Sequence, residues 1–185
     1  MIKSIFFIIH NLVLYPKFLL KRSKVSMHAR LSTNLLLSHT LVGAYTYIGK
    51  GVIVNDTKIG RYCSIAAGSQ IGALDHSWKN VVTSTLLDDF SSNKKTAIGN
   101  GVWIGANTII MKGVKVGEGA VIGANSFVKT DIPSYSLAFG TPAKVYKYRF
   151  SKDIIYEITR SMYWQHKPSK AKKIVISLKE KIQEM

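Results

Sequence analysis

Branched apolar residues recur along this chain on a period of six. An isoleucine or valine begins each hexad, and glycine follows it in four of six cases; the hexads begin at Ile98, Ile104, Ile110, Val116, Ile122 and Val128. An α-helix repeats about every 3.6 residues and a strand about every two, while a coiled coil needs a repeat of about seven with fewer glycines. The pattern therefore predicts none of these three.

A second block of the same repeat lies earlier in the chain. It begins at Val42, Ile48 and Val54 and continues, after a slip of one residue, at Ile59, Ile65 and Ile71. The fifth position of the hexads is mostly small or β-branched, as at Thr46, Cys63 and Val114. Val25 and Leu31, which are also six residues apart, fit the period weakly.

A period of six is typical of a β-solenoid. Each hexad supplies one short strand and one turn, the branched residue points inward, and glycine permits the turn dihedrals. Three hexads, or about eighteen residues, close one triangular coil, and stacked coils bury a continuous apolar column that no single coil could bury alone. We therefore expect an all-β solenoid with parallel coils.

The charge of the chain is strongly positive and unevenly distributed. Its 185 residues include 26 Lys and Arg against 10 Asp and Glu, a formal charge of +16, and no acidic residue precedes Asp56. These basic residues lack the aromatic or helix-turn-helix context of nucleic-acid-binding proteins, so we expect no nucleic-acid partner. The single cysteine, Cys63, excludes an internal disulfide and fits a reducing cytoplasm. Its fifth position in a hexad favours a packing role over a catalytic thiol.

The two ends of the chain do not follow the repeat. Residues 1–30 form an apolar, basic segment that we expect to be helical, but His10, Pro16 and Lys17 interrupt it, and a membrane span needs about 20 mostly apolar residues. No small-residue cleavage site of a secretory signal follows. A helix that covers the open end of the solenoid is favoured, and an interfacial helix on anionic lipid is the alternative. Residues 144–185 predict a basic, amphipathic helical segment.

The solenoid is predicted over residues 31–143, with one interruption between Ile71 and Ile98. There the hexads fail for about twenty residues, which predicts an excursion loop over 73–97. Loops that a rigid scaffold excludes are frequent places for binding and catalytic residues. This loop contains His76, which is therefore our candidate catalytic residue.

The two repeat blocks, the loop between them and the motifs that follow resemble, in this order, the hexapeptide-repeat acyltransferases, which fold as a left-handed parallel β-helix. The resemblance covers about residues 40–165 and is closest to the branch of the xenobiotic acetyltransferases, which modify chloramphenicol and streptogramins, and of the polysaccharide O-acetyltransferases. It is carried by "IGRYCSIAAGSQIG", the loop with its histidine, "AIGNGVWIGANTIIMKGVKVGEGAVIGANSFV", "GTPAKV" and "YKYRF". The resemblance implies a left-handed solenoid, acetyl-CoA as co-substrate, and a homotrimer with active sites at the subunit interfaces.

The resemblance also implies roles for individual residues. His76 takes the place of the general base, and Ala106 and Ala124, one coil apart, take the place of the turns along which pantetheine lies. The CoA phosphates are expected near Lys129, Thr130, Lys144 and Lys147. Trp103 matches a recurrent aromatic residue of the family, for which we expect packing. No metal ion is implied.

The chemistry of acyl transfer suits such a histidine. A hydroxyl must lose a proton as it attacks the thioester carbonyl, and an imidazole with a pKa near about 6.5 can accept that proton and pass it to the departing thiolate. A backbone N–H that faces the carbonyl would stabilise the oxyanion. No serine or cysteine nucleophile is needed, so we expect direct transfer. Which group orients His76 stays open.

The acceptor is less specified than the reaction. The loop reads "ALDH" where the antibiotic-modifying members have a "GNH" type of turn, and "TSTLLDDF" lacks the proline of their "STYPF"-like element. With the basic, apolar segment 1–30, these departures favour O-acetylation of a sugar hydroxyl in a bacterial surface polysaccharide or its precursor. The expected location is cytoplasmic, with peripheral contact at the inner membrane face left open. The alternatives are an antibiotic acetyltransferase and an N-acetyltransferase of nucleotide-linked amino sugars.

Two other functions fit the sequence less well. The γ-class carbonic anhydrases share the solenoid, but their zinc needs three histidine ligands, and the predicted coils and loop offer only His39 and His76. A purely structural solenoid would leave His76 and the cofactor turns unexplained.

Overall fold

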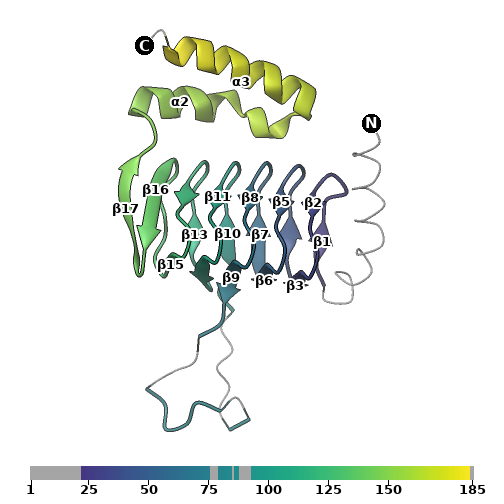
Figure 1. Ribbon diagram of the computed structural model, residues 1–185, viewed down its shortest axis with the longest axis vertical. Helices are drawn as coiled ribbons and strands as arrows, with labels where there is room; N and C mark the ends of the chain where they lie inside the picture. Colours follow the sequence, from purple (N-terminus) through teal and green to yellow (C-terminus); the bar gives the residue numbers. More distant parts are fainter. Residues whose placement is uncertain (1–21, 76–78, 85, 88–92, 184–185) are drawn as a thin grey trace.

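The computed structural model describes residues 22–75, 79–84, 86–87 and 93–183. These residues form a solenoid of short strands, from which a loop projects on one side, and a pair of helices that lies on another (Figure 1). The structure confirms the predicted left-handed parallel β-helix. Residues 1–21, which make up most of the predicted N-terminal segment, lie outside the described residues.

Three parallel sheets form the sides of the solenoid. Sheet A contains β1 (Lys24–Val25), β4 (Leu41–Val42), β7 (Thr57–Ile59), β10 (Thr96–Ile98) and β13 (Lys115–Val116). Sheet B contains β2 (Arg30–Leu31), β5 (Tyr47–Ile48), β8 (Ser64–Ile65), β11 (Trp103–Ile104), β14 (Val121–Ile122), β16 (Ser136–Gly140) and the antiparallel β17 (Ala143–Tyr148). Sheet C contains β3 (Leu36–Ser38), β6 (Ile53–Asn55), β9 (Gln70–Ala73), β12 (Ile109–Met111) and β15 (Phe127–Val128).

The residue that begins each hexad forms the core. In both blocks of the repeat this residue is at most 5% exposed, and most of these side chains are fully buried. The fifth positions pack beside them at the corners; Thr46, Cys63 and Val114, for example, are all buried. The period of six therefore correctly identified which side chains point inward.

The solenoid begins earlier than the predicted boundary at residue 31. Val25 and Leu31 are buried in a first coil, and Lys24 and Val25 pair with Leu41 and Val42 of the next. The paired residues are 17 positions apart, because Leu37 and Val42 are only five positions apart where sheet C turns into sheet A. The shorter corner breaks the period of six, which is why residues 24–31 fitted it weakly.

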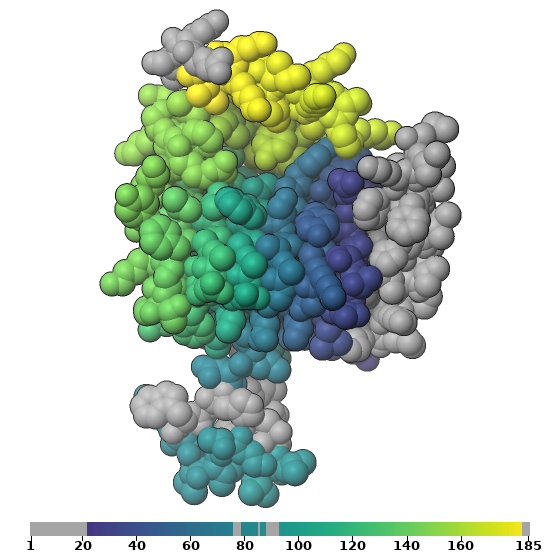
Figure 2. All heavy atoms as spheres, in the orientation of Figure 1, coloured from purple at the N-terminus to yellow at the C-terminus, as the bar shows by residue number. Residues whose placement is uncertain are grey.

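Three rows of stacked corners join the sheets, and we name them by the sheets that they connect. The AB corner carries a column of glycines. A Cβ atom on Gly99 would lie 2.7 Å from the amide nitrogen of Glu118, so only glycine fits there between stacked coils. The CA corner is where the spacing of the hexads varies and where the excursion loop leaves, between β9 and β10. The described part of that loop projects clear of the solenoid (Figure 2).

The C-terminal segment is helical only from Lys152. It contains α2 (Lys152–Ser161), a 3₁₀ turn (Tyr163–Gln165) and α3 (Pro168–Gln183), which pack over the AB corner. The Tyr62 hydroxyl donates to the carbonyl oxygen of His166 at 2.8 Å, and Trp164 is buried. The predicted start at 144 was too early, because residues 143–148 instead form β17, which folds back on β16 and covers the end of sheet B. None of the helices in the described residues is long and apolar enough to cross a membrane.

Candidate functional site

The excursion loop has a rigid root at the CA corner. The Lys112 N–H donates to the carbonyl of Ala73, the last residue before the loop, and the Thr96 N–H donates to the carbonyl of Asp56 where the loop returns, both at 3.0 Å. The Lys112 ammonium also lies 3.0 Å from a carboxylate oxygen of Asp56, and these side chains are only 13% and 32% exposed. Both ends of the loop are therefore tied to one ion pair.

His76 lies outside the described residues. Its chain neighbour Asp75 is exposed, and Ala73, three residues earlier, still belongs to β9. Farther out, Val81, Leu86 and Leu87 are 103%, 92% and 77% exposed, so the described part of the chain does not cover these aliphatic side chains.

Ala106 and Ala124 lie on the same BC corner, one coil apart, as expected. The Asn125 N–H donates to the carbonyl of Ala106 at 2.8 Å, and the Asn107 N–H donates in the same way to Ala67 at 3.0 Å. The side chain of Ala124 is exposed and that of Ala106 is half-buried. The corner therefore presents stacked main chain with little side-chain bulk.

The four residues assigned to the CoA phosphates are divided among different places. Lys144 is the second residue of β17 and lies beside the BC corner, where the Thr141 hydroxyl donates to the carbonyl of Asn125 at 3.2 Å. Lys147 lies farther along β17, opposite Leu137. Lys129 and Thr130 follow β15 at the CA corner, across sheet C. All four side chains are exposed, and the structure brings only Lys144 next to the stacked alanine turns.

Two further residues of the repeat have clear surroundings. Cys63 is 1% exposed, its thiol donates to the carbonyl oxygen of Gly99 at 3.0 Å, and burial raises its pKa to about 11. Both facts agree with the predicted packing role. Trp103, by contrast, is 55% exposed on the outer face of β11. The expectation that it packs is therefore wrong for the described chain, because the sixth position of each hexad, directly before the inward-pointing residue, faces outward.

No group of three or more His, Cys, Asp or Glu side chains in the described ranges could hold a metal ion.

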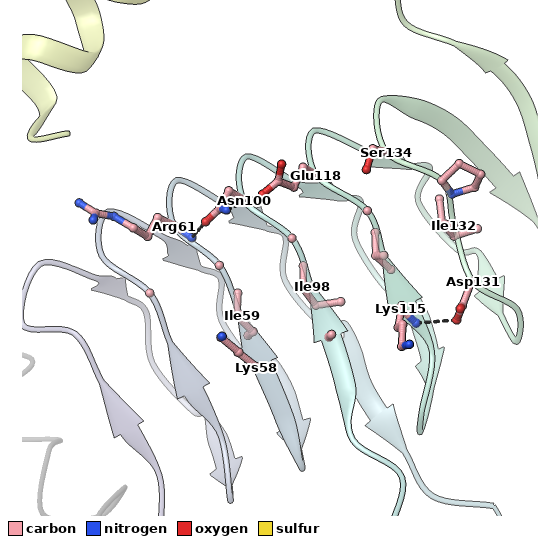
Figure 3. Close-up of a pocket in the computed structure, with 17 residues that line it drawn as sticks. Lys58, Ile59, Arg61, Ile98, Asn100, Lys115, Glu118, Asp131, Ile132 and Ser134 are labelled. Carbon is pink, nitrogen blue, oxygen red and sulfur yellow. Dashed lines mark hydrogen bonds between the residues drawn. The ribbon is translucent and has the colours of Figure 1, made fainter. Parts of the chain in front are cut away.

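A groove of about 850 Å³ crosses the outer side of sheet A, away from the BC corner (Figure 3). Its lining includes Lys58 and Lys115 on the strands and Arg61, Asn100 and Glu118 at the AB corner. Sequence reasoning missed this groove. The signal was present, because glycine at the second position of successive hexads leaves this side of the coils without side chains.

Comparison with known proteins supplies the remaining evidence. The family described as "Bacterial transferase hexapeptide (six repeats)" matches residues 39–73 and 95–130. A chloramphenicol acetyltransferase of Morganella morganii is 36% identical over 121 residues, which are 57% of this chain and 58% of that protein. The chain thus spans about three fifths of the length of this relative.

Two more relatives extend the comparison. A probable macrolide acetyltransferase of Lysinibacillus sphaericus is 33% identical over 135 residues, which are 65% of this chain and 72% of that protein. Among solved structures, a maltose O-acetyltransferase from Clostridium difficile 630 superposes with a TM-score of 0.62 and 26% identity, covering 70% of each chain.

Proposed function

Because this chain belongs to the bacterial hexapeptide transferase family, we propose that it transfers an acetyl group from acetyl-CoA to a sugar hydroxyl. The acceptor is a bacterial surface polysaccharide or its precursor. The observation that carries this proposal is the combination of one bare, stacked corner at Ala106 and Ala124 with one histidine-bearing loop on a rigid root. The relative similar in sequence, a chloramphenicol acetyltransferase, and the solved structure similar in fold, a maltose O-acetyltransferase, are both acetyltransferases.

The BC corner fits the cofactor arm of acetyl-CoA. An extended pantetheine needs main-chain hydrogen-bonding groups at regular spacing and no bulky side chain above them. Ala106 and Ala124 meet both needs, since their side chains are the smallest that still have a Cβ atom and their turns are stacked one coil apart. Lys144, at the same corner, is placed to bind a phosphate. The remaining residues assigned to the CoA phosphates lie away from this corner in a single chain. In the proposed trimer they would reach CoA that is bound between two subunits; they are Lys129, Thr130 and Lys147.

In the proposed reaction, His76 is the general base. Its neutral imidazole takes the proton of the acceptor hydroxyl while the oxygen attacks the thioester carbonyl. The carbon–sulfur bond then breaks, His76 returns the proton to the departing thiolate, and the products are the acetyl ester and free CoA. An acyl-enzyme on Cys63 is disfavoured, because the thiol is buried and its pKa of about 11 keeps it protonated. Transfer is therefore direct.

The proposed assembly is a homotrimer with shared sites. The outer face of sheet C carries Leu36, Ile53, Ile109 and Phe127, and Leu36 and Ile109 are 40% and 37% exposed. Together with the exposed aliphatic residues of the loop, this face is more apolar than a solvated sheet face needs to be. Cyclic symmetry would place the loop of one subunit over the BC corner of its neighbour. His76 and the cofactor turns would then come from different subunits.

A polysaccharide acceptor would also account for the basic N-terminal residues. Enzymes that act on lipid-linked glycans work at the inner membrane face, and each basic side chain near anionic lipid adds about 1 kcal/mol of attraction. We therefore place the protein in the cytoplasm, with the residues that precede the first coil, which begins at Lys24, as its contact to the membrane.

Antibiotic acetylation is the second candidate. The chloramphenicol and macrolide relatives favour it, whereas the loop sequences "ALDH" and "TSTLLDDF" depart from the antibiotic-modifying pattern and favour a different acceptor. The purified protein should be offered acetyl-CoA with chloramphenicol, a macrolide, nucleotide-linked amino sugars and deacetylated polysaccharide, with release of the CoA thiol as the signal. We expect turnover with the polysaccharide. Turnover of a drug alone would overturn the proposed acceptor, and turnover of an amino sugar would move the reaction to nitrogen.

A further inference from the structure

The groove on sheet A has the shape of a trough along the solenoid axis. It extends from Gly43 in the second coil to Ser134 in the sixth, and four steps of about 4.8 Å between parallel strands give it a length of about 19 Å. Its central strand is β10, the strand on which the excursion loop rejoins the solenoid at Thr96. The trough therefore lies beside the root of the loop, on a different side from the BC corner.

The floor of the trough is nearly free of side chains. Along the AB corner it consists of Gly43, Gly60, Gly99 and Gly117. A Cβ atom on Gly60 would lie 2.6 Å from the carbonyl oxygen of Gly99, so the stacking of the coils itself requires glycine there. On the strands, Ala97 lies in register between Lys58 and Lys115. The small residue leaves a gap between two long cationic side chains.

The two walls present different chemistry (Figure 3). Lys58 and Lys115 form one wall, and in the described part of the chain neither ammonium group has an ion-pair partner. Arg61, Asn100 and Glu118 form the other wall, where the Asn100 side chain donates to Glu118 at 2.8 Å. The Nε atom of Arg61 is buried and has no hydrogen-bond partner among the described residues.

The acidic residues of the trough are already engaged. Asp131 accepts a hydrogen bond from the Lys115 N–H at 2.7 Å, and Glu118 accepts the one from Asn100. The ammonium groups of Lys58 and Lys115 are therefore the charged groups that remain available to a ligand, whereas the Arg61 guanidinium lies 5.5 Å from the ring of Tyr45. A ligand in the trough should carry spaced negative charges.

The wall residues also narrow the class of polymer. Among the described residues, no aromatic side chain lines the trough, and single-stranded nucleic acids depend on aromatic side chains for base stacking. Amide and hydroxyl groups, as at Asn100 and Ser134, are instead suited to sugar hydroxyls, because each can make more than one hydrogen bond. We propose that the trough binds an extended acidic glycan, with its carboxylates at Lys58 and Lys115 and its hydroxyls at the AB corner. This inference rests on the proposed function for the idea that the glycan is the acceptor, or a stretch of it.

The test is direct binding without acetyl-CoA. Fluorescently labelled polygalacturonate and polysialate oligomers should bind the full chain, as followed by anisotropy, while neutral dextran should not. The double variant Lys58→Glu with Lys115→Glu should weaken binding about tenfold or more, because two short-range attractions become repulsions. Ala97→Trp should weaken glycan binding to a similar extent, because the indole would fill the gap between Lys58 and Lys115. Both residues that pair with Ala97 are lysines, so this row of the sheet accommodates long side chains.

The matched control is Lys172→Glu with Lys173→Glu on α3, which makes the same change in net charge at residues that do not line the trough. We expect at most a twofold loss from this control. Equal losses from both double variants, no binding of either acidic glycan, or equally tight binding of an oligo(dT) strand would each overturn the proposal. Glycan binding that depends on the trough without acetyl transfer would contradict the proposed function alone. Acetyl transfer with binding unaffected by the trough variants would contradict this inference alone.

Discussion

The Lys112 ammonium and the Asp56 carboxylate meet at 3.0 Å across the coil from which the excursion loop leaves the solenoid. The main chains of the same two residues hold the last residue before the loop and the first strand residue after it. Residues from the coils above and below thus fix both ends of the loop at once. The excursion loop that carries His76 in the sequence is therefore anchored at both ends by these contacts.

Replacing Lys112 with methionine should loosen this frame without unfolding the protein. Partly exposed ion pairs contribute about 1 kcal/mol or less to the free energy of unfolding, so the melting temperature should change little. Trypsin should nevertheless cut the loop faster at Lys79. The control is Lys181→Met, which removes the exposed ion pair with Glu157 between the two helices. Equal cleavage rates in both variants would show that the pair does not hold the loop.

The stacking of the BC corner predicts different costs for two glycine substitutions. In Gly105→Ala the new Cβ atom would lie 2.4 Å from the amide nitrogen of Ala124, so the coils must separate, and we expect a loss of about 3 kcal/mol. Gly51 has a φ of +70° but open space around the missing Cβ atom, so Gly51→Ala should cost only about 1 kcal/mol of backbone strain. Urea unfolding of both variants measures the difference. A larger loss for Gly51→Ala would contradict the packing of this corner.

The outer face of sheet C should be the trimer interface. Light scattering of the native protein at micromolar concentration should give three times the mass of the chain. Ile109→Asp, on sheet C, should shift the mass toward the monomer, because it would bury an unpaired charge at the interface. Leu41→Asp makes a similar change at an exposed position of sheet A and should leave the trimer intact. A monomeric native protein, or dissociation only by Leu41→Asp, would contradict the proposed assembly.

The BC corner should bind the cofactor arm. Ala124→Trp would place a large side chain over the stacked turns, so we expect it to lower acetyl-CoA affinity at least about tenfold. Thr33 occupies the equivalent corner position in the first coil, where its carbonyl accepts from Gly51. Thr33→Trp is therefore the matched control and should bind acetyl-CoA normally in a calorimetric titration. If the affinities of the two variants are alike, pantetheine lies on another corner.

The sequence predicted the interior of the solenoid well, because the same constraint, burial of a branched apolar side chain, repeats at every hexad. The prediction failed where the chain does not follow this repeat. Leu37 and Val42 are only five positions apart, so the first coil did not follow the period of six. Strand β17 runs antiparallel to β16, so it does not belong to a parallel coil. The ion pair between Asp56 and Lys112 joins residues that are 56 positions apart in the sequence, on either side of the loop. A local sequence pattern cannot predict such a long-range contact. The trough on sheet A exists because its floor is made of glycines. A search for functional side chains in the sequence does not find such a feature.

The measurement that tests the account most directly is the turnover number of His76→Ala beside that of His39→Ala. Each histidine follows a strand of sheet C in the sequence, but only His76 belongs to the excursion segment, and the imidazole of His39 lies 3.1 Å from the Ser38 hydroxyl. With acetyl-CoA and the acceptor that the native protein uses, we expect His76→Ala to lower turnover about 10²- to 10⁴-fold, the usual contribution of a general base. Acetyl-CoA affinity and the melting temperature should stay unchanged, and His39→Ala should retain its activity. Full turnover by His76→Ala would contradict the proposed mechanism.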